Sequence, residues 1–366
     1  MRKGWEYKRL DECANIEYGT RVVQKKDSGT LYPVYGGGGE TFRMDKFNRE
    51  DCLIVARFAM SRRCVRFVNG KFFLNDSGLS VKAGDKLYQS YLNYNIISLN
   101  DDIYHLGKGA AQRNLDVKSF KKLTIAIPPQ STQLAIVSEL DKINELIRLK
   151  KEQLKDFDNL AQSLFYEMFG DPVENEKGWD VKKLKDISRE IGDGLHGTPE
   201  YSEVDTGCYF INGNNLENGT IVIKENTKMV SEKTKAKHYI EMDDFTILVS
   251  INGSLGKVAF YNGENVILGK SACYIKLEAY NDKKYIFELL KSDYFKRYAE
   301  SECTGTTIRN VSLKSMRNFR CPLPPLSLQQ LFAQRIEQIE REKSEVQKSI
   351  QDLETLLASR MQYWFE

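Results

Sequence analysis

The fold of this chain is decided by two stretches that share one pattern, IPPQSTQLAIVSEL at 127–140 and LPPLSLQQLFAQRI at 323–336. They are related by a sequence offset of 196, and each opens with a proline pair. Proline suits the start of a helix because it lacks the N–H that would be unpaired there. The apolar residues that follow are spaced three and four apart, the period of one helix face. Each stretch therefore predicts the start of an amphipathic helix in a duplicated chain.

The duplication extends into the parts before these helices. Gly4-Trp5-Glu6 recurs as Gly178-Trp179-Asp180 at an offset of 174, whereas Arg113-Asn114-Leu115 recurs as Arg309-Asn310-Val311 at an offset of 196. The offset therefore increases within the repeat. We interpret the chain as a tandem duplication whose second copy has gained about 22 residues in its globular part.

The apolar stripe after each proline pair continues for about five heptads, which favours a coiled coil. Each helix should run ~35–38 residues, and the first should end at Gly170-Asp171-Pro172. The alternative is two separate amphipathic helices, each docked on its own domain. Charged residues interrupt the stripe at Lys150, Lys343 and Arg360. The expected coiled-coil residues are Ile136, Leu140, Ile143, Ile147, Leu154, Phe157, Phe332, Ile336, Ile339, Val346, Ile350 and Leu353.

The globular parts combine short alternating runs with Gly- and Asn-rich breaks, so we expect an α+β chain with two mixed α/β domains. Strands are expected at 52–57, 65–68, 245–249, 257–261 and 272–277, and a helix at 283–300. A length of 366 residues also favours two domains or more. No apolar run approaches the ~18 residues of a membrane span, and the N-terminus lacks a signal-peptide core. Seven scattered cysteines and three histidines favour a reduced, cytoplasmic protein without a disulfide scaffold or structural zinc.

Positive charge is concentrated in the first globular part. Residues 1–128 carry 22 Lys and Arg against 14 Asp and Glu, a net charge of +8, although the whole chain carries only +3. Acid-free basic clusters occur at 57–66, 108–115 and 303–324. Arg and Lys bind phosphates, and Arg, Gln and Asn can contact base edges. These clusters predict local contacts to nucleic acid; the alternative is a solvated basic surface.

The sequence motifs that resemble enzymatic signatures are incomplete. Gly269-Lys270-Ser271 resembles the end of a phosphate-binding loop, but Glu264 stands where a glycine is needed, and a strand pattern follows instead of a helix. The four glycines at 36–39 lack the strand–loop–helix context of a dinucleotide site. No histidine–carboxylate cluster indicates a metal site or a nucleophilic triad. We expect no catalytic residue, no metal and no cofactor in this chain.

The chain as a whole resembles the specificity subunits of type I restriction–modification systems. The resemblance covers the order of globular half, proline pair and long helix, repeated once. It is carried by GWEYKRLDE (4–12), VYGGGGE (34–40), GWDVKKLKDI (178–187), GDGLHGTPEY (192–201), FINGNNLENGTI (210–221), DDFTILVSINGSLGKVAF (243–260), IPPQSTQ (127–133) and LPPLSLQQ (323–330).

The resemblance implies two target-recognition domains, at 1–128 and 171–325, and two spacer helices, at 129–170 and 326–366. The helices would pack antiparallel and set the distance between two half-sites of double-stranded DNA. Partners would be two methyltransferase subunits, which bind S-adenosylmethionine and methylate adenine N6, and restriction subunits driven by Mg-ATP. This chain would recognise the DNA sequence without catalysing a reaction.

Candidate DNA contacts follow from the basic clusters and the resemblance. The first domain offers Tyr35, Arg57, Ser61, Arg62, Arg63, Lys108, Gln112 and Arg113. The second offers His196, Thr198, Asn214, Asn252, Ser254, Lys270, Thr306, Thr307 and Arg309. His196 could instead cap its turn, and Tyr35 could be a core aromatic. At an offset of 193, Arg57 aligns with Ser250. At the same offset, Met60 and Arg63 of the first copy align with Gly253 and Gly256 of the second. This departure suggests that the two domains read different half-sites.

Two other functions remain open on the sequence. One is the specificity subunit of a two-component system whose partner combines modification and cleavage, which neighbouring genes would reveal. The other is a coiled-coil adaptor that binds only protein, which predicts no salt-sensitive binding to DNA.

Overall fold

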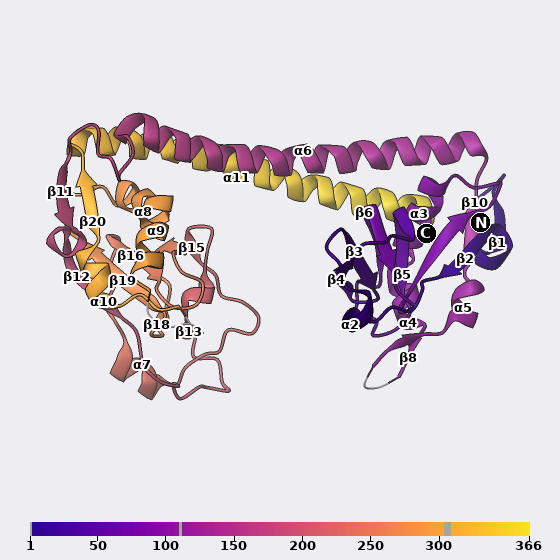
Figure 1. Cartoon of the computed structure of the whole chain (residues 1–366), viewed down its shortest axis with the longest axis horizontal. Coiled ribbons are helices and arrows are strands. Elements are labelled where there is room, and N and C mark those ends of the chain that lie inside the picture. Colours follow the sequence, from indigo (N-terminus) through magenta and orange to yellow (C-terminus); the bar gives the residue numbers. More distant parts are fainter. Residues whose placement is uncertain (1, 110–111, 304–308) are drawn as a thin grey trace. The chain divides into compact units, whose positions relative to one another are not determined.

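The computed structural model describes residues 2–109, 112–303 and 309–366 and divides into two compact units (Figure 1). Unit 1 comprises Met1–Lys151 and Gln347–Glu366, and unit 2 comprises Glu152–Val346. The long helices α6 (Gln130–Phe169) and α11 (Leu326–Phe365) each contribute one part to either unit. Each unit therefore holds one globular domain together with a segment of both helices.

The domain of unit 1 is built on a six-stranded sheet in the order β2-β7-β5-β6-β3-β4, in which β3 and β6 are parallel and the other neighbours antiparallel. Its strands are β2 (Ala14–Tyr18), β3 (Tyr32–Gly36), β4 (Gly39–Met44), β5 (Arg49–Ala56), β6 (Val65–Leu74) and β7 (Gly78–Ala83). Two short pairs accompany it, β1 (Glu6–Arg9) with β10 (Thr124–Ile127) and β8 (Gly107–Lys108) with β9 (Asn114–Leu115). The short helices are α1 (Leu10–Cys13), α2 (Gln24–Asp27), α3 (Gln89–Ser98), α4 (Asn100–His105) and α5 (Val117–Lys121).

The domain of unit 2 repeats this plan. Its main sheet has the order β12-β19-β16-β17, which corresponds to β2-β7-β5-β6. Those strands are β12 (Ser188–Asp193), β16 (Thr246–Ser250), β17 (Val258–Phe260) and β19 (Ala272–Leu277). The pairs are β11 (Asp180–Lys183) with β20 (Arg320–Leu323), β13 (Tyr209–Ile211) with β18 (Val266–Leu268), and β14 (Leu216–Glu217) with β15 (Thr220–Ile221). The helices are η1 (Leu184–Ile187), η2 (Gly213–Asn215), α7 (Glu232–His238), α8 (Lys283–Lys291), α9 (Asp293–Ser301) and α10 (Leu313–Asn318).

Equivalent backbone hydrogen bonds locate the extra residues of the second copy. Asn75 N–H donates to Tyr35 C=O at 2.9 Å, and Gly269 N–H donates to Ile211 C=O at 2.8 Å. The sequence offset is 176 between Tyr35 and Ile211 but 194 between Asn75 and Gly269. Most of the growth in the offset therefore takes place between these two points, and most of the extra residues lie there.

Two further hydrogen bonds narrow the position of the insertion. Arg57 N–H donates to Ser77 C=O at 2.8 Å, and Ile251 N–H donates to Ser271 C=O at 3.0 Å, so the offset has already reached 194 at Ile251. The extra residues therefore lie in the connection between β13 and β16, which contains β14, β15 and α7. The same bonds correct the alignment of Arg57 with Ser250, because the structural equivalent of Arg57 is Ile251.

The apolar stripes of α6 and α11 form an antiparallel seam within each unit. Together with the two domains that contain the sheets, these helices confirm the expected α+β architecture. Nine of the twelve expected seam residues are buried, and Leu154, Phe157 and Leu353 are half-buried. Two of the charged interruptions make ion pairs between the helices. Lys343 Nζ lies 2.9 Å from Asp158 Oδ1 in unit 2, and Arg360 pairs with Glu139 in unit 1. The seam continues into each domain, where the helix ends join the core above the sheet.

The prediction of one continuous helix at 283–300 is wrong, because the segment forms two helices, α8 and α9, with a break at Ser292. Ser292 Oγ donates to Leu289 C=O at 2.6 Å, and the Ser292 backbone is extended (ψ 160°). Such a local side-chain bond competes with the helical pattern. Throughout residues 2–109, 112–303 and 309–366, we find no helix that is both long and apolar enough to span a bilayer.

Candidate nucleic-acid interface

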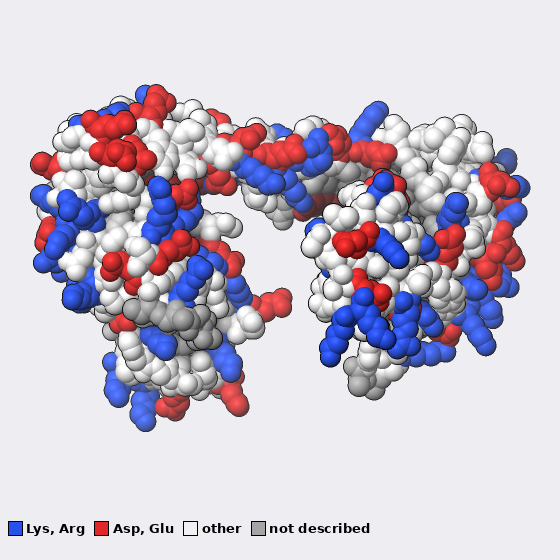
Figure 2. Space-filling view, in the orientation of Figure 1, with Lys and Arg blue, Asp and Glu red and all other residues white. Residues whose placement is uncertain are grey.

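The connection between β5 and β6 brings together most candidates of unit 1. Met60 N–H donates to Arg113 C=O at 2.9 Å, and Leu115 N–H donates to Arg57 C=O at 2.8 Å. These two bonds join the β5–β6 connection to the segment around β9, so that Arg57 and the run from Ser61 to Arg63 lie beside Arg113. Figure 2 shows Lys and Arg side chains gathered at the end of unit 1 that carries β8.

Aromatic rings position the arginines of this cluster. The Arg113 guanidinium lies 4.6 Å from the centre of the Tyr104 ring, and that of Arg62 lies 6.0 Å from the same ring. Arg57 lies 4.4 Å from the Phe58 ring and donates from Nη1 to Asp76 C=O at 3.2 Å. Arg57 is therefore held in place, whereas Arg62 and Arg63 are exposed.

Arg66 belongs to this cluster, although it was not among the expected contacts. Its Nη2 donates to Gly37 C=O at 3.1 Å and to Arg63 C=O at 3.0 Å. Gly37 N–H in turn donates to Ser77 Oγ at 3.0 Å. Arg66 therefore ties the glycine turn to the β5–β6 connection. Its place in the acid-free run 57–66 was the signal that could have identified it.

The remaining candidates of unit 1 differ in their surroundings. The Tyr35 ring packs edge-to-face on Phe72, with centres 5.5 Å apart, beside a small apolar cluster. Lys108 Nζ lies 2.5 Å from Asp116 Oδ2, and this hydrogen bond, with others from Ser119, lowers the pKa of Asp116 to about 2. Ser61 Oγ donates to Arg63 C=O at 3.2 Å, and Gln112 is exposed.

In unit 2 the candidates gather at the end of the sheet where β16 finishes and β19 begins. Lys270 N–H donates to Leu195 C=O at 3.1 Å, which joins the turn of His196 to the start of β19. Gly213 N–H donates to Ser271 Oγ at 3.0 Å. These bonds bring the segments of His196, Asn214 and Lys270 side by side.

The arginine of the second copy joins the same end of the sheet. Gly253 N–H donates to Arg309 C=O at 3.0 Å, which repeats the bond between Met60 and Arg113 in unit 1. Asn252 lies in the same connection and forms an isolated bridge with Asn310. The duplicated framework therefore places Arg113 and Arg309 at equivalent points.

Glycine is required at two of these junctions by close approach rather than by φ. A Cβ on Gly213 would lie 2.1 Å from Ser250 Oγ, and one on Gly269 would lie 2.3 Å from Asn212 Oδ1. Both distances are shorter than van der Waals contact, so the loops pack closely because they lack side chains there. The clustering of glycines and asparagines in the sequence reflects this packing.

The candidate side chains of unit 2 are mostly exposed. His196 Nε2 lies 2.8 Å from Asp193 Oδ2, and Arg309 Nη1 lies 3.4 Å from Glu300 Oε1. Across the described ranges, Lys270 has no ion-pair partner. Thr198, Asn214 and Ser254 are also exposed, and Asn252 is half-buried. The expected contacts Thr306 and Thr307 lie outside the described residues.

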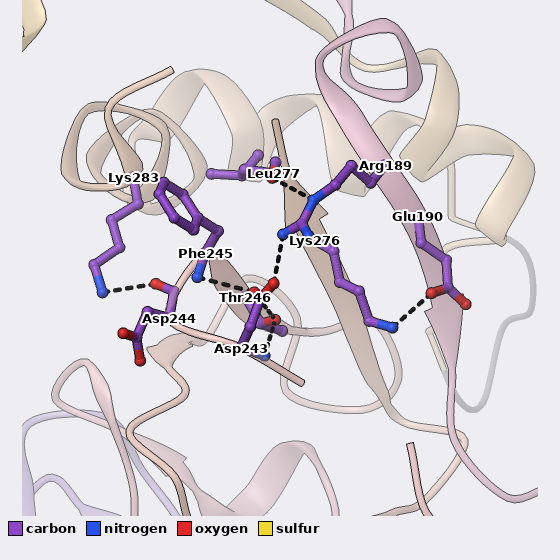
Figure 3. Close-up of polar contacts among 9 residues, drawn as sticks. All are labelled: Arg189, Glu190, Asp243, Asp244, Phe245, Thr246, Lys276, Leu277 and Lys283. Carbon is purple, nitrogen blue, oxygen red and sulfur yellow. Dashed lines mark hydrogen bonds and ion pairs between the residues drawn. The ribbon is translucent and has the colours of Figure 1, made fainter. Parts of the chain in front are cut away.

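Charges at the opposite end of β16 are paired among themselves (Figure 3). Arg189 Nη2 lies 2.6 Å from Asp243 Oδ2, and Lys276 Nζ lies 2.6 Å from Glu190 Oε2. Hydrogen bonds from Lys276 and Tyr274 lower the pKa of Glu190. This end of the sheet is therefore internally neutralised, unlike the end that carries Lys270.

Within residues 2–109, 112–303 and 309–366, no three or more His, Cys, Asp and Glu side chains lie close enough together to hold a metal ion. The geometry instead presents cations, amides and hydroxyls on closely packed loops, groups that contact phosphates and base edges.

The two domains share one framework, and each presents cationic and amide side chains at the same end of its sheet. The chain belongs to the family of type I restriction modification DNA specificity domains, whose model matches residues 2–156 and again 176–355. The MjaVIII type I restriction enzyme specificity subunit of Methanocaldococcus jannaschii is 22% identical over 79% of this chain and 75% of its own length. A putative type I restriction enzyme specificity subunit of Haemophilus influenzae is 22% identical over 88% of this chain and 84% of its own length.

Solved structures share the fold. A crystal structure of the S subunit of a type I restriction–modification system from M. genitalium covers 98% of this chain and 95% of its own length, with a TM-score of 0.53 and 17% identity. A chain from a study of complex assembly and conformational transition of the type I system covers 100% of this chain and 98% of its own length. Its TM-score is 0.59 at 16% identity. The comparisons confirm the expected family and its two-domain fold.

Proposed function

We propose that this chain is the DNA-recognition subunit of a cytoplasmic type I restriction–modification complex, in which each unit reads one half of a bipartite target. The observation that carries this proposal is the repeated sheet end, on which the same backbone bonds present different side chains. Arg57 in unit 1 has Ile251 as its equivalent in unit 2, and Met60 has Gly253. Two readers with one framework and different side chains suit two different half-sites.

The proposed role is to direct chemistry that other subunits perform. In this proposal two methyltransferase subunits bind S-adenosylmethionine and methylate adenine, and restriction subunits use Mg-ATP. This chain contributes no catalytic residue and no cofactor. The helices α6 and α11 would set the gap between the half-sites through their length.

Exposed leucines on the long helices support docking of the methyltransferase subunits. Leu160 on α6 and Leu356 on α11 are related by the same offset of 196, and their exposures of 50% and 46% are nearly equal. An apolar side chain that is exposed at the same position of both repeats suits two copies of one partner, because duplicated surfaces bind identical subunits.

The docking proposal is tested by Leu160→Glu and Leu356→Glu in the full-length chain. Each substitution should lower the number of methyltransferase subunits recovered per chain from two to one, as measured by native mass spectrometry. Lys155→Glu is the matched control, since it places the same charge about 140° around α6 from Leu160. Full recovery of both subunits with both leucine variants would contradict the docking surface.

The recognition role is tested by modification-sensitive sequencing of genomic DNA with and without the gene. A bipartite N6-methyladenine motif should disappear on deletion. An unchanged methylome, together with no salt-sensitive DNA binding by the purified methyltransferase complex, would instead support the protein-binding adaptor. Cleavage and modification by a single partner would support the two-component system.

A further inference from the structure

The connection between β13 and β16, which is longer than its counterpart in unit 1, forms one wall of an open pocket beside the candidate interface. The pocket has a volume of about 430 Å³, within the range of small-ligand sites. One wall comes from residues 201–214 around β13 and includes Tyr201, Phe210, Asn212 and Asn214. The other comes from residues 224–228, farther along the lengthened connection between β13 and β16.

Hydrogen bonds hold the two walls together. Asn215 Nδ2 donates to Val222 C=O at 2.9 Å and to Thr227 Oγ1 at 3.2 Å. Phe210 N–H donates to Lys228 C=O at 2.9 Å. Lys224 Nζ donates to Asn214 C=O at 2.9 Å and so closes the end of the pocket. The pocket is therefore formed before any ligand binds, which limits the entropy lost on binding.

The chemistry of the pocket suits a nucleotide. Three lysines and no carboxylate are among its lining residues. Lys224 and Lys257 both pair with Glu217, at 2.7 and 3.9 Å. Lys228 instead lies over the Tyr201 ring, 4.7 Å from the ring centre. Over the described ranges, the side-chain amides of Asn214 and Asn226 make no hydrogen bond within the chain, and both residues are exposed.

The pocket is continuous with the candidate interface. Asn212 lines it and also accepts a hydrogen bond from Ser271 Oγ at 3.0 Å, and Ser271 binds the Gly213 N–H. The loop that borders the pocket is therefore the one that lies beside Lys270. DNA that contacts this end of the sheet would lie beside the opening.

We propose that this pocket binds one nucleotide of the second half-site, with Lys228 at a phosphate and the amides of Asn214 and Asn226 at the base edge. An asparagine amide both donates and accepts, so it can distinguish one base from another. Tyr201 supplies an apolar ring face for the sugar or base. This inference rests on the proposed function and assigns specificity-determining residues to unit 2. Unit 1 reads its half-site without such a wall, because its corresponding connection is shorter.

The test uses the methyltransferase complex that contains the full-length chain. A library of DNA duplexes is incubated with the complex, and bound duplexes are sequenced to give the preference at each base pair. The double variant Asn214→Ala/Asn226→Ala should lose about 5- to 150-fold of its discrimination at one position of one half-site. The other half-site should be unchanged and serves as an internal control for folding.

Lys228→Ala should weaken binding to all duplexes alike and reduce the slope of log affinity against log salt by about one. Matched controls are Asn262→Ala and Lys237→Ala, which are exposed in unit 2 but do not line the pocket. Asn226→Ala alone gives a second variant with minimal effect on folding, since that side chain is exposed.

Unchanged preferences at every position in the double variant would overturn the pocket assignment. Competition by a free deoxynucleoside monophosphate that requires Asn214 and Asn226, with DNA preference unaffected by their loss, would also overturn it and assign the pocket to a free nucleotide. A wild-type complex without any sequence preference is a different result, because it would refute the proposed function itself.

Discussion

Gln133 and Gln329 occupy equivalent positions of the two repeats and make the same connection in the two units. Gln133 Oε1 accepts from Tyr88 N–H at 2.9 Å, and Gln329 Oε1 accepts from Asp282 N–H at 3.0 Å. Each Nε2 donates to the carbonyl of the first proline in its own pair, at 3.0 and 2.8 Å. Tyr88 and Asp282 precede α3 and α8, so a buried amide ties the first turn of each long helix to its domain.

Loss of either amide should destabilise its own unit. Gln133→Ala or Gln329→Ala leaves a buried proline C=O and a partly buried N–H without their partner, at a cost of about 1–3 kcal/mol in the free energy of unfolding. Chemical denaturation followed by hydrogen exchange would show the loss and assign it to one unit. The neighbouring exposed Gln330→Ala is the control, and an equal loss in that control would contradict the anchoring role.

Two arginines of unit 1 should have different effects on DNA binding. Arg57 is fixed by Phe58 and the Asp76 carbonyl, so we expect a base-edge contact, and Arg57→Ala should cost about 1–3 kcal/mol and relax one position of the motif. Arg62 is exposed, and Arg62→Ala should weaken all sequences alike. Binding of a duplex library at several salt concentrations separates the two effects. The same loss profile for both variants would refute the distinction.

Arg309 occupies in unit 2 the point that Arg113 occupies in unit 1. Arg309→Ala should therefore weaken binding through the second half-site and leave the preferences of the first half-site intact. Affinity for duplexes in which one half-site is scrambled gives the measurement. Unchanged affinity and an unchanged motif would remove Arg309 from the interface.

Gly213→Ala should disturb the loops of unit 2 because the new Cβ would lie 2.1 Å from Ser250 Oγ. Overpacking of this kind costs about 1–3 kcal/mol of stability. We expect weaker discrimination at the second half-site and a lower unfolding midpoint. Gly38→Ala is the control, since its Cβ would have no atom within 4 Å. Wild-type stability of Gly213→Ala would show that the loops rearrange without cost.

Glu288 should make the stability of unit 2 depend on pH. Burial raises the pKa of this carboxyl above its ordinary 4.5, and Lys291, 3.5 Å away, offsets burial only in part. The folded chain therefore binds the proton more tightly, and its stability falls as pH rises above 4.5 through the folded-state pKa. Glu288→Gln should gain stability relative to the wild type at pH 7 but not at pH 4. Denaturation midpoints at both values test this, and equal differences would contradict it.

The repeat and the long helices could be predicted from sequence because their signals are regular. The 3-4 spacing of residues such as Ile136 and Ile336 follows directly from helix geometry, and proline pairs mark both helix starts. The sequence shows Lys343 and Arg360 as charged interruptions of the stripe, but their partners Asp158 and Glu139 depend on how two distant segments align. The packing of the two helices decides which residues pair across the seam, and the sequence of one helix alone does not show it.

The interface was less predictable because local sequence does not report what a side chain contacts. Arg57 was identified as a basic loop residue, yet its aromatic neighbour Tyr18 ends β2, much earlier in the chain. The second wall of the pocket, with Asn226 and Lys228, carries no motif and lies in the lengthened connection between β13 and β16. The helical periodicity also does not reveal the break at Ser292, because the apolar residues before and after Ser292 keep the same helical spacing.

The bonds from Met60 N–H to Arg113 C=O and from Gly253 N–H to Arg309 C=O use no side-chain atoms. Mutations at these loop positions can therefore change what is read while the scaffold that presents the loops persists. The duplicated backbone thus gives the lineage a direct route to altered specificity, with most of the inherited fold left intact.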